Sequence, residues 1–394
     1  MKTPKSNRPH IGIFGRRNVG KSSLINAITR QDLSIVSATP GTTTDPVEKA
    51  MELLPFGPVV FIDTAGLDDV GDLGRQRADR SYRILERTDL ALVVIEGEPV
   101  PSDLQLVDRL REVDIPFIPV FNKADVNDYP VPLQLGGTDG YAVSALTGNG
   151  ISELAARMIQ MLESLADDLN MSLTGDLVPP GGLAVLVVPI DKEAPAGRLI
   201  LPQVQTIRDL LDNDAYCMVV KDRELYHALE ALGRKPDIVI TDSQAFLKVS
   251  ADVPEDIPMT SFSILFARQK GDLSLLAEGA RAIDRLKDGD SVLIAEACTH
   301  HAVGDDIGTV KIPRMLRQYT GRKLDFRFAK GKNADMPSDV ALMIHCGGCM
   351  LNRRAMLSRL RDLTGRQIPV TNYGMTLAYT MGIFERALKP FNPA

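Results

Sequence analysis

Three of the four cysteines and three of the five histidines of this 394-residue chain lie in two short segments. The first segment, "ACTHH", contains Cys298 and His300, and the second, "HCGGC", contains His345, Cys346 and Cys349. Cysteine thiolates and histidine nitrogens bind zinc, and thiolates also hold iron–sulfur clusters. Because random scatter would rarely gather these residue types in two places, we predict a metal site built from both segments.

The residue types alone leave the identity of the metal open. Three cysteines and one histidine could form a closed structural zinc site. The spacing C-x-H-x44-H-C-x-x-C, however, differs from the short knuckles of a zinc finger. Three cysteines with a weak or open fourth position are typical of an iron–sulfur cluster whose fourth iron takes an exchangeable ligand.

Each ligand segment follows an apolar run that is typical of a buried β-strand. "SVLIAEACTHH" reaches Cys298 after such a run, and "DVALMIHCGGC" repeats the construction before Cys346. A third run, "QIPVTNYG", is expected to end near Asn372 and Tyr373. Ligands of open α/β sheets bind beyond the carboxyl ends of parallel strands, so we expect these strand ends to lie together.

A second chemistry appears near the amino terminus, where "GRRNVGKS" from Gly15 to Ser22 matches G-x-x-x-x-G-K-[ST]. An apolar strand, "HIGIFG", precedes it, and an amphipathic helix is expected after it. Loop amides and the helix N-terminus bind phosphates, while Lys21 reaches the β- and γ-phosphates and Ser22 holds Mg²⁺. The residues expected to surround the phosphates are Gly15, Asn18, Val19, Gly20, Lys21, Ser22 and Ser23.

Four further segments identify the nucleotide as GTP. "ATPGTTTDP" is typical of a switch loop whose threonines complete the Mg²⁺ shell, and "VVFIDTAG" is typical of a γ-phosphate sensor with Asp63 and Gly66. A carboxylate in "PVFNKAD" can accept two N–H bonds from guanine, and "AVSALTG" can cap the base. The residues predicted to recognise guanine are Asn122, Lys123, Asp125, Ser144 and Ala145.

Residues 8–165 resemble the TrmE–Era–EngA group of GTPases through these motifs. In that group a P-loop asparagine, here Asn18, helps hold a K⁺ ion, and the match makes Thr43 the Mg²⁺-binding threonine. Gly71 stands where TrmE-like proteins carry a catalytic glutamate, and Leu67 follows D-T-A-G where a glutamine could stand. We therefore expect slow hydrolysis. The residues expected to support it are Asn18, Lys21, Thr43, Asp63 and Gly66.

The middle of the chain shows no evident site. After the Pro- and Gly-rich "LTGDLVPPGG", strand-like and helix-like runs alternate, which predicts βαβ units on a parallel sheet. "TSFSILFARQKG" is expected to add a further strand. We expect Cys217 to be a buried core thiol and His227 to be structural. A sheet without a visible site is a candidate for dimerisation.

Composition limits the class of protein. A hydrophobic content of 44% and a charged content of 24% are typical of a soluble globular protein. The net charge of −6 argues against broad nucleic-acid binding. There is no apolar signal-peptide region, and the longest apolar runs are too short to span a bilayer, so we expect a cytoplasmic protein without a membrane association.

The P-loop, the segment "DKEAPAGRLILPQVQTIRDLLD" and the C-x-H…H-C-x-x-C pattern together resemble the HydF family of FeFe-hydrogenase maturation GTPases over almost the whole chain. The resemblance implies an α/β protein of three domains with mainly parallel sheets. They are a Ras-like P-loop GTPase domain (1–172), a βα dimerisation domain (180–270) and a βα domain that binds a 4Fe–4S cluster (271–394).

The resemblance also implies a scaffold and carrier. Such a protein receives a di-iron precursor from two radical-SAM maturases and delivers it to apo-hydrogenase, and it forms a homodimer through its middle domain. Cys298, Cys346 and Cys349 match the cluster cysteines, and His300 and His345 match the motif histidines. The fourth ligand, and the step that GTP drives, stay open.

A different class of function is an RNA-modification or ribosome-assembly GTPase with a structural zinc domain. That hypothesis predicts a basic C-terminal face. "LNRRAMLSRLRDLTGR" is locally basic, but a solvated helix face would explain it equally well.

Overall fold

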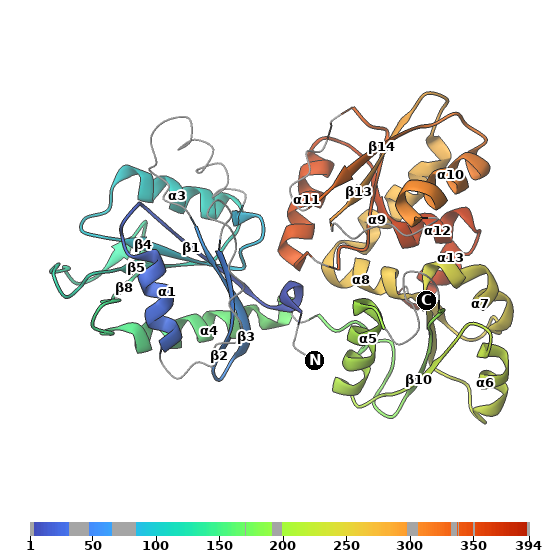
Figure 1. Cartoon of the computed structure of the whole chain (residues 1–394), viewed down its shortest axis with the longest axis horizontal. Coiled ribbons are helices and arrows are strands. Elements are labelled where there is room, and N and C mark those ends of the chain that lie inside the picture. Colours follow the sequence, from blue (N-terminus) through green and yellow to red (C-terminus); the bar gives the residue numbers. More distant parts are fainter. Residues whose placement is uncertain are drawn as a thin grey trace. The chain divides into compact units, whose positions relative to one another are not determined.

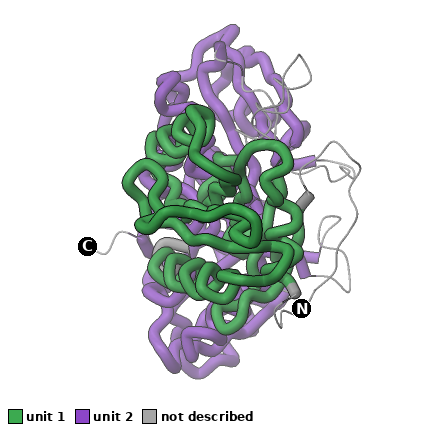
Figure 2. The backbone as a smooth tube through the Cα atoms, turned by 90° about the vertical axis from the view of Figure 1, so that its left-hand side faces the viewer, with its two compact units in different colours: residues 1–170, 352–355 green, residues 171–351, 356–394 purple. Residues whose placement is uncertain are grey.

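The computed structural model describes residues 4–30, 47–64, 84–169, 171–190, 199–297, 306–331, 337, 339–349 and 351–391. The chain divides into two units, residues 1–170 with 352–355 and residues 171–351 with 356–394 (Figure 2). In the described part of the chain, no helix is both long enough and apolar enough to cross a membrane.

The first unit contains a six-stranded sheet that is parallel except for one edge pair. Alternating side chains of its strands are buried on both faces, as expected for a sheet covered by helices. In sheet order, its strands are β2 (Val47–Leu53), β3 (Gly57–Asp63), β1 (His10–Gly15), β4 (Leu90–Ile95), β5 (Phe117–Phe121) and β8 (Tyr141–Ala142).

Helices cover the two faces of this sheet (Figure 1). Side chains of α1 (Lys21–Arg30) and α4 (Ile151–Leu169) share one apolar core with Ile11 and Ile13 of β1. Side chains of α3 (Pro101–Glu112) share the opposite core with strand residues such as Phe14 of β1 and Val93 of β4. The short elements are η1 (Lys5–Asn7) and the ribbon of β6 (Gln134–Leu135) and β7 (Thr138–Asp139).

The second unit begins with a four-stranded, fully parallel sheet in the order β10-β9-β11-β12. Its strands are β9 (Leu183–Val187), β10 (Tyr216–Val220), β11 (Ile238–Thr241) and β12 (Met259–Ser261). Its helices are α5 (Leu201–Asp212), α6 (Leu225–Ala231), η2 (Ser243–Ala245), α7 (Phe246–Asp252) and α8 (Phe262–Lys270).

A third sheet, β14-β13-β15-β16, is also parallel and repeats the strand order of the second sheet. Its strands are β13 (Ser291–Glu296), β14 (Asp325–Lys330), β15 (Leu342–His345) and β16 (Val370–Asn372). The helical elements of this part are α9 (Leu273–Arg281), η3 (Ala282–Arg285), η4 (Ile307–Lys311), α10 (Ile312–Thr320), α11 (Arg353–Gly365), α12 (Tyr373–Thr380), α13 (Phe384–Leu388) and η5 (Lys389–Phe391). The predicted α/β class with mainly parallel sheets is confirmed.

One predicted element is wrong. The segment "TSFSILFARQKG" contributes only the end of β12 and then forms helix α8. Ser261 caps this helix, because its side chain accepts a hydrogen bond from the Ile264 N–H at 3.3 Å. Most α8 side chains are buried, so the helix lacks the polar face that would have revealed its period in the sequence.

Two residues of the middle part were singled out in the sequence, Cys217 as a buried core thiol and His227 as a structural residue. Cys217 packs against the core but is only half-buried, because β10 is an edge strand. His227 projects from α6 with 82% of its side chain exposed, beside Glu230. Neither residue lies in a site within the described part of the chain.

Candidate functional site

The loop between β1 and α1 has the backbone of a phosphate-binding loop. Gly20 has a φ of +91°, and a Cβ atom there would lie 2.3 Å from the Asn122 amide nitrogen, so only glycine fits. Lys21 is buried, and its ammonium donates to the carbonyl oxygens of Gly15 at 3.0 Å and Arg16 at 2.7 Å. A lysine held on loop carbonyls is ready to meet phosphate oxygens when a nucleotide binds.

Two oxygen-bearing side chains lie beside this loop and are hydrogen-bonded to each other. The Ser22 hydroxyl donates to an Asp63 carboxylate oxygen at 2.5 Å, although the two residues come from α1 and the end of β3. Oxygen ligands of this kind suit Mg²⁺, which nucleotide-binding proteins hold through few protein groups plus phosphates. The donor set therefore fits a Mg²⁺–nucleotide complex. Thr43 and Gly66 lie outside the described residues.

The predicted guanine-binding residues converge on the same end of the sheet. The Asn122 side chain donates to the Val19 carbonyl oxygen at 2.8 Å and accepts from the Ala145 N–H at 3.1 Å. Asn122 thereby joins the phosphate loop to the loop after β8. Asp125 accepts a hydrogen bond from the Ser144 hydroxyl at 2.6 Å, which orients its exposed carboxylate.

Two contacts at this site were not expected from the sequence. Lys123 has a φ of 61°, and its ammonium lies 2.6 Å from a carboxylate oxygen of Glu96, directly after β4. The Tyr129 hydroxyl donates to the Asn122 carbonyl oxygen at 2.5 Å. Glu96 could have been noticed, because it is an acidic residue at the carboxyl end of a buried strand.

The remaining phosphate-loop residues differ in their exposure to solvent. Val19 is buried, whereas Asn18 and Ser23 are exposed. Asn18 has a φ of 63°, a conformation that asparagine tolerates better than most residues. An exposed amide at this position can meet a ligand without rearrangement of the core.

Two of the residues predicted to bind a metal, His345 and Cys346, lie at and directly after the end of β15, which pairs with the neighbouring parallel strand β13. The Cys346 N–H donates to the Ala295 carbonyl oxygen at 2.9 Å, and the Ala297 N–H donates to the Cys346 sulfur at 3.2 Å. Ala297 immediately precedes Cys298, which lies outside the described residues together with His300. The expectation that these two strand ends lie together is confirmed.

The two described cysteines fit a thiolate-bound metal or cluster by their chemistry. Cys346 and Cys349 are half-buried thiols, and Gly348 between them has a φ of +60° that lets the loop turn. An N–H bond to a ligand sulfur, such as that from Ala297, also tunes iron–sulfur clusters. The described residues alone hold no group of three or more metal-ligating side chains.

His345 is buried at the end of β15 and both its ring nitrogens have partners. Its Nδ1 lies 2.6 Å from the Cys346 carbonyl oxygen, which only accepts, so Nδ1 carries the proton. Its Nε2 lies 2.9 Å from the Arg359 guanidinium, which only donates, so Nε2 accepts. The His345 ring would become a metal ligand through Nε2 only if Arg359 left that nitrogen. The sequence marked Arg359 only as part of the locally basic segment 351–366 and not as a partner of His345.

Known proteins resemble the first unit. The tRNA modification GTPase MnmE of Chromobacterium violaceum is 34% identical over 156 residues, which is 39% of this chain and 34% of that protein. The MnmE of Xylella fastidiosa is 40% identical over 154 residues, 38% of this chain and 33% of that protein. The chain thus spans about a third of the length of these relatives.

Among solved structures, Era of Aquifex aeolicus aligns over 54% of this chain and 92% of its own, with 19% identity and a TM-score of 0.33. The G domain of the T. maritima FeoB iron transporter aligns over 39% of this chain and 98% of its own, with 23% identity and a TM-score of 0.30.

Three family models match successive parts of the chain. Residues 10–123 match the 50S ribosome-binding GTPase family. Residues 173–271 match the hydrogen maturase F dimerization domain, and residues 274–390 match the hydrogen maturase F tetramerization domain. The last two models share one protein family, and in the chain they follow the part that matches a GTPase domain. The chain belongs to the hydrogen maturase F (HydF) family, with a GTPase domain joined to that family's two oligomerization domains.

Proposed function

We propose that this chain is a GTPase that acts as scaffold and carrier in FeFe-hydrogenase maturation. It holds a 4Fe–4S cluster, receives a di-iron precursor from two radical-SAM maturases and delivers it to apo-hydrogenase in the cytoplasm. The domains in this proposal are residues 1–172 for GTP, 180–270 for dimerisation and 271–394 for the cluster. GTP binding or hydrolysis times the loading or release of the cargo.

One observation carries the proposal. In a chain with a complete guanine-binding frame, the strand end before Cys298 is hydrogen-bonded to the sulfur of Cys346 at 3.2 Å. Three thiolates then come from two neighbouring strand ends, and the fourth position is left for an exchangeable ligand. His300 and His345 are the candidates for that position.

The proposed nucleotide site rests on the GTPase motifs of the sequence and on the match to a GTPase family. Lys21 and Asn18 face the phosphates, and Asp63 and Gly66 sense the γ-phosphate. Ser22 and Thr43 bind Mg²⁺, and a K⁺ ion supports hydrolysis beside Asn18. Guanine is held by Asn122, Lys123, Asp125, Ser144 and Ala145.

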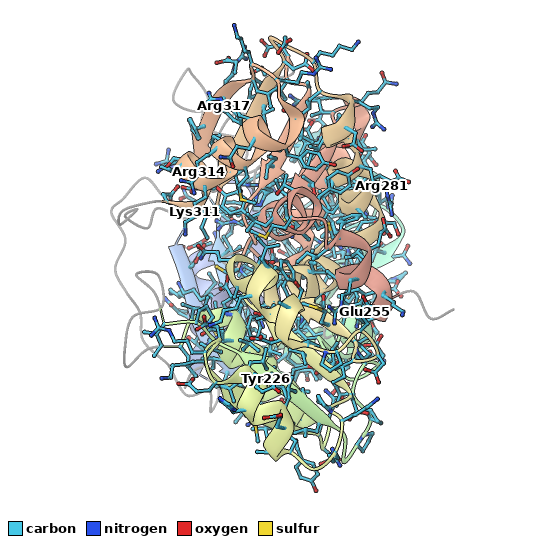
Figure 3. All side chains as sticks on the ribbon, turned by 90° about the vertical axis from the view of Figure 1, so that its right-hand side faces the viewer. Tyr226, Glu255, Arg281, Lys311, Arg314 and Arg317 are labelled. Atoms are coloured by element: carbon cyan, nitrogen blue, oxygen red, sulfur yellow. The ribbon has the colours of Figure 1, made fainter. Side chains whose placement is uncertain are left out.

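The alternative hypothesis, an RNA-directed GTPase with a zinc domain, needs cations that are free to meet phosphates. Several cations of this part of the chain have partners within it. Arg281 and Arg317 are labelled in Figure 3. Arg281 forms an ion pair with Glu385 at 3.2 Å, and the Arg317 guanidinium lies 4.9 Å from the centre of the Phe326 ring. Arg359 donates to His345. These contacts suggest that the three arginines stabilise the fold and do not serve to bind nucleic-acid phosphates.

Anaerobic reconstitution with iron and sulfide tests the proposal. The loaded protein is expected to be brown, to contain about four irons per chain and to show the EPR signal of a reduced 4Fe–4S cluster. It is then incubated with the two maturases and apo-hydrogenase, and hydrogen evolution is measured. A colourless protein that binds one zinc ion would support the alternative, and a brown protein that never activates apo-hydrogenase would contradict the carrier role.

A further inference from the structure

Lys270, the last residue of α8, is a buried cation at the metal-binding loop. Only 3% of this residue is exposed. Its ammonium donates to the carbonyl oxygen of Cys349 at 3.1 Å and to that of Leu351 at 2.9 Å. No carboxylate in the described part of the chain lies within ion-pair distance of it. A buried charge normally has a counter-charge, so this one calls for an explanation.

The charged end of Lys270 lies at the loop that carries Cys346 and Cys349. One of the two carbonyl groups that the ammonium binds belongs to Cys349 itself, the second cysteine of the C-x-x-C pair. The ammonium also lies 5.6 Å from the centre of the Phe266 ring, an arrangement that stabilises a cation modestly. The ring therefore favours a positive charge here, while the described part of the chain places no carboxylate beside it.

The lysine comes from a different domain than the loop it binds. Lys270 lies in the part that matches the dimerization domain, residues 173–271, whereas Cys349 and Leu351 lie in the tetramerization domain, residues 274–390. Sequence separations of 79 and 81 residues divide the donor from its two acceptors. The contact is thus a tertiary link between two domains of the second unit.

The first turn of α8 contacts the third sheet, β14-β13-β15-β16, to which the strand before the C-x-x-C loop also belongs. The Asn372 side chain, at the end of β16, donates to the Ser263 carbonyl oxygen at 3.2 Å. A Cβ atom on Gly374 would lie 1.8 Å from the Ser263 hydroxyl, so the helix and the start of α12 are in close contact. One helix of the dimerization domain therefore spans from the end of β16 to the C-x-x-C loop.

We propose that Lys270 is a positioning residue for the 4Fe–4S cluster, through which helix α8 holds the C-x-x-C loop and sets a positive charge beside the cluster. This inference rests on the proposed function, because it requires that Cys346 and Cys349 hold that cluster. Two hydrogen bonds fix the path of the backbone at and after Cys349. The ammonium balances the negative charge of the thiolates and of the cluster.

This role has two measurable consequences. A nearby cation stabilises the reduced cluster more than the oxidised one, so it raises the reduction potential. A loop that is held by two hydrogen bonds also releases iron more slowly, because groups that orient metal ligands commonly contribute 10–100-fold in affinity. A purely structural lysine would not move the reduction potential.

The test uses the full chain, reconstituted anaerobically. Lys270→Met removes the charge and both hydrogen bonds at similar volume, and Lys270→Arg keeps a charge. Lys287→Met removes one exposed cation at the opposite end of β13 and is the matched control. The cluster is titrated with dithionite, which gives one electron to each cluster and is oxidised to sulfite, while EPR follows the reduced state. Iron loss to a chelator is measured in parallel.

For Lys270→Met we expect a lower midpoint potential and iron loss about 10-fold faster than in the unmutated protein. The midpoint potential and the rate of iron loss of Lys270→Arg should lie between those of Lys270→Met and the unmutated protein. Both quantities should be unchanged in Lys287→Met. If the Met variant fails to fold, as judged by circular dichroism and oligomeric state, Lys270→Gln carries the same test. An unchanged potential and an unchanged rate of iron loss would overturn the inference. An unmutated protein without a cluster would instead overturn the proposed function.

Discussion

Asp125 shows how single residues determine nucleotide choice. Its carboxylate is oriented by the Ser144 hydroxyl and is exposed, so it can accept two N–H bonds from a guanine edge. We expect Asp125→Asn to weaken GTP binding roughly 10- to 100-fold, since hydrogen bonds to a charged group are worth about 1.5–3 kcal/mol. Binding of xanthosine triphosphate should rise, because donor and acceptor are exchanged.

Competition titrations of GTP, xanthosine triphosphate and ATP measure this change. Asp128→Asn, an exposed neighbour in the same loop, is the control and should leave GTP binding unchanged. If ATP and GTP compete equally for the unmutated protein, the assignment of a guanine site is wrong.

Asn18 makes a second prediction at the same scale. Its amide is exposed in the phosphate loop, where the resemblance to TrmE-like GTPases implies a K⁺ ion. A cation there can offset charge that develops between the β- and γ-phosphates. We expect slow hydrolysis that rises on the order of tenfold when KCl replaces NaCl. The Asn18→Ala variant should lose this difference, and equal rates for the unmutated protein at matched ionic strength would contradict the prediction.

At the scale of elements, α5 anchors the start of the second unit. The Asp209 carboxylate on α5 accepts from the backbone N–H groups of Leu173 at 3.0 Å and Thr174 at 2.8 Å. It also accepts from the hydroxyls of Thr174 at 2.6 Å and Ser172 at 3.0 Å. One carboxylate therefore satisfies four donors of the segment that enters the middle sheet.

Asp209→Ala should lower the free energy of unfolding of the second unit by about 2–4 kcal/mol, because several donors lose a charged acceptor. Asp212→Ala on the same helix removes only an exposed ion pair with Arg208, so its effect should stay within about 0.5 kcal/mol. Urea titrations followed by circular dichroism compare the two variants. Equal unfolding midpoints would show that the four hydrogen bonds add nothing.

At the scale of the whole molecule, the GTP site and the cysteine loop belong to different units, each with its own apolar cores. We therefore expect their ligands to be lost independently. Cys346→Ala should lose the cluster, since two remaining thiolates hold a cubane poorly, while GTP affinity stays unchanged. Lys21→Ala should lose GTP and keep the cluster. Iron analysis and nucleotide titration of both variants decide the matter.

His345→Ala is the informative companion to these variants. Because Arg359 and the Cys346 carbonyl occupy both ring nitrogens, we expect a protein that stays brown with an altered EPR signal or altered precursor transfer. Complete loss of iron from His345→Ala would show that the imidazole is a required ligand. A full cluster in Cys346→Ala would disprove the cysteine assignment.

The GTPase motifs could be read from the sequence because each is a contiguous segment with its own local geometry. Gly15 to Ser22 forms a loop whose glycine at position 20 must approach another side chain, and the amino-acid order alone carries that requirement. The strands that end at Glu296 and His345 were readable for a similar reason, since buried parallel strands are continuous apolar runs.

Tertiary structure alone decided which of these segments touch. The hydrogen bond from Asn122 to Val19 spans 103 residues and that from Ala297 to Cys346 spans 49, and no local pattern encodes either partner. Helix α8 was mistaken for a strand because its burial on nearly all sides removed the polar face. Lys270 gave no sign in the sequence, because its role depends on the position of the C-x-x-C loop after the whole unit has packed.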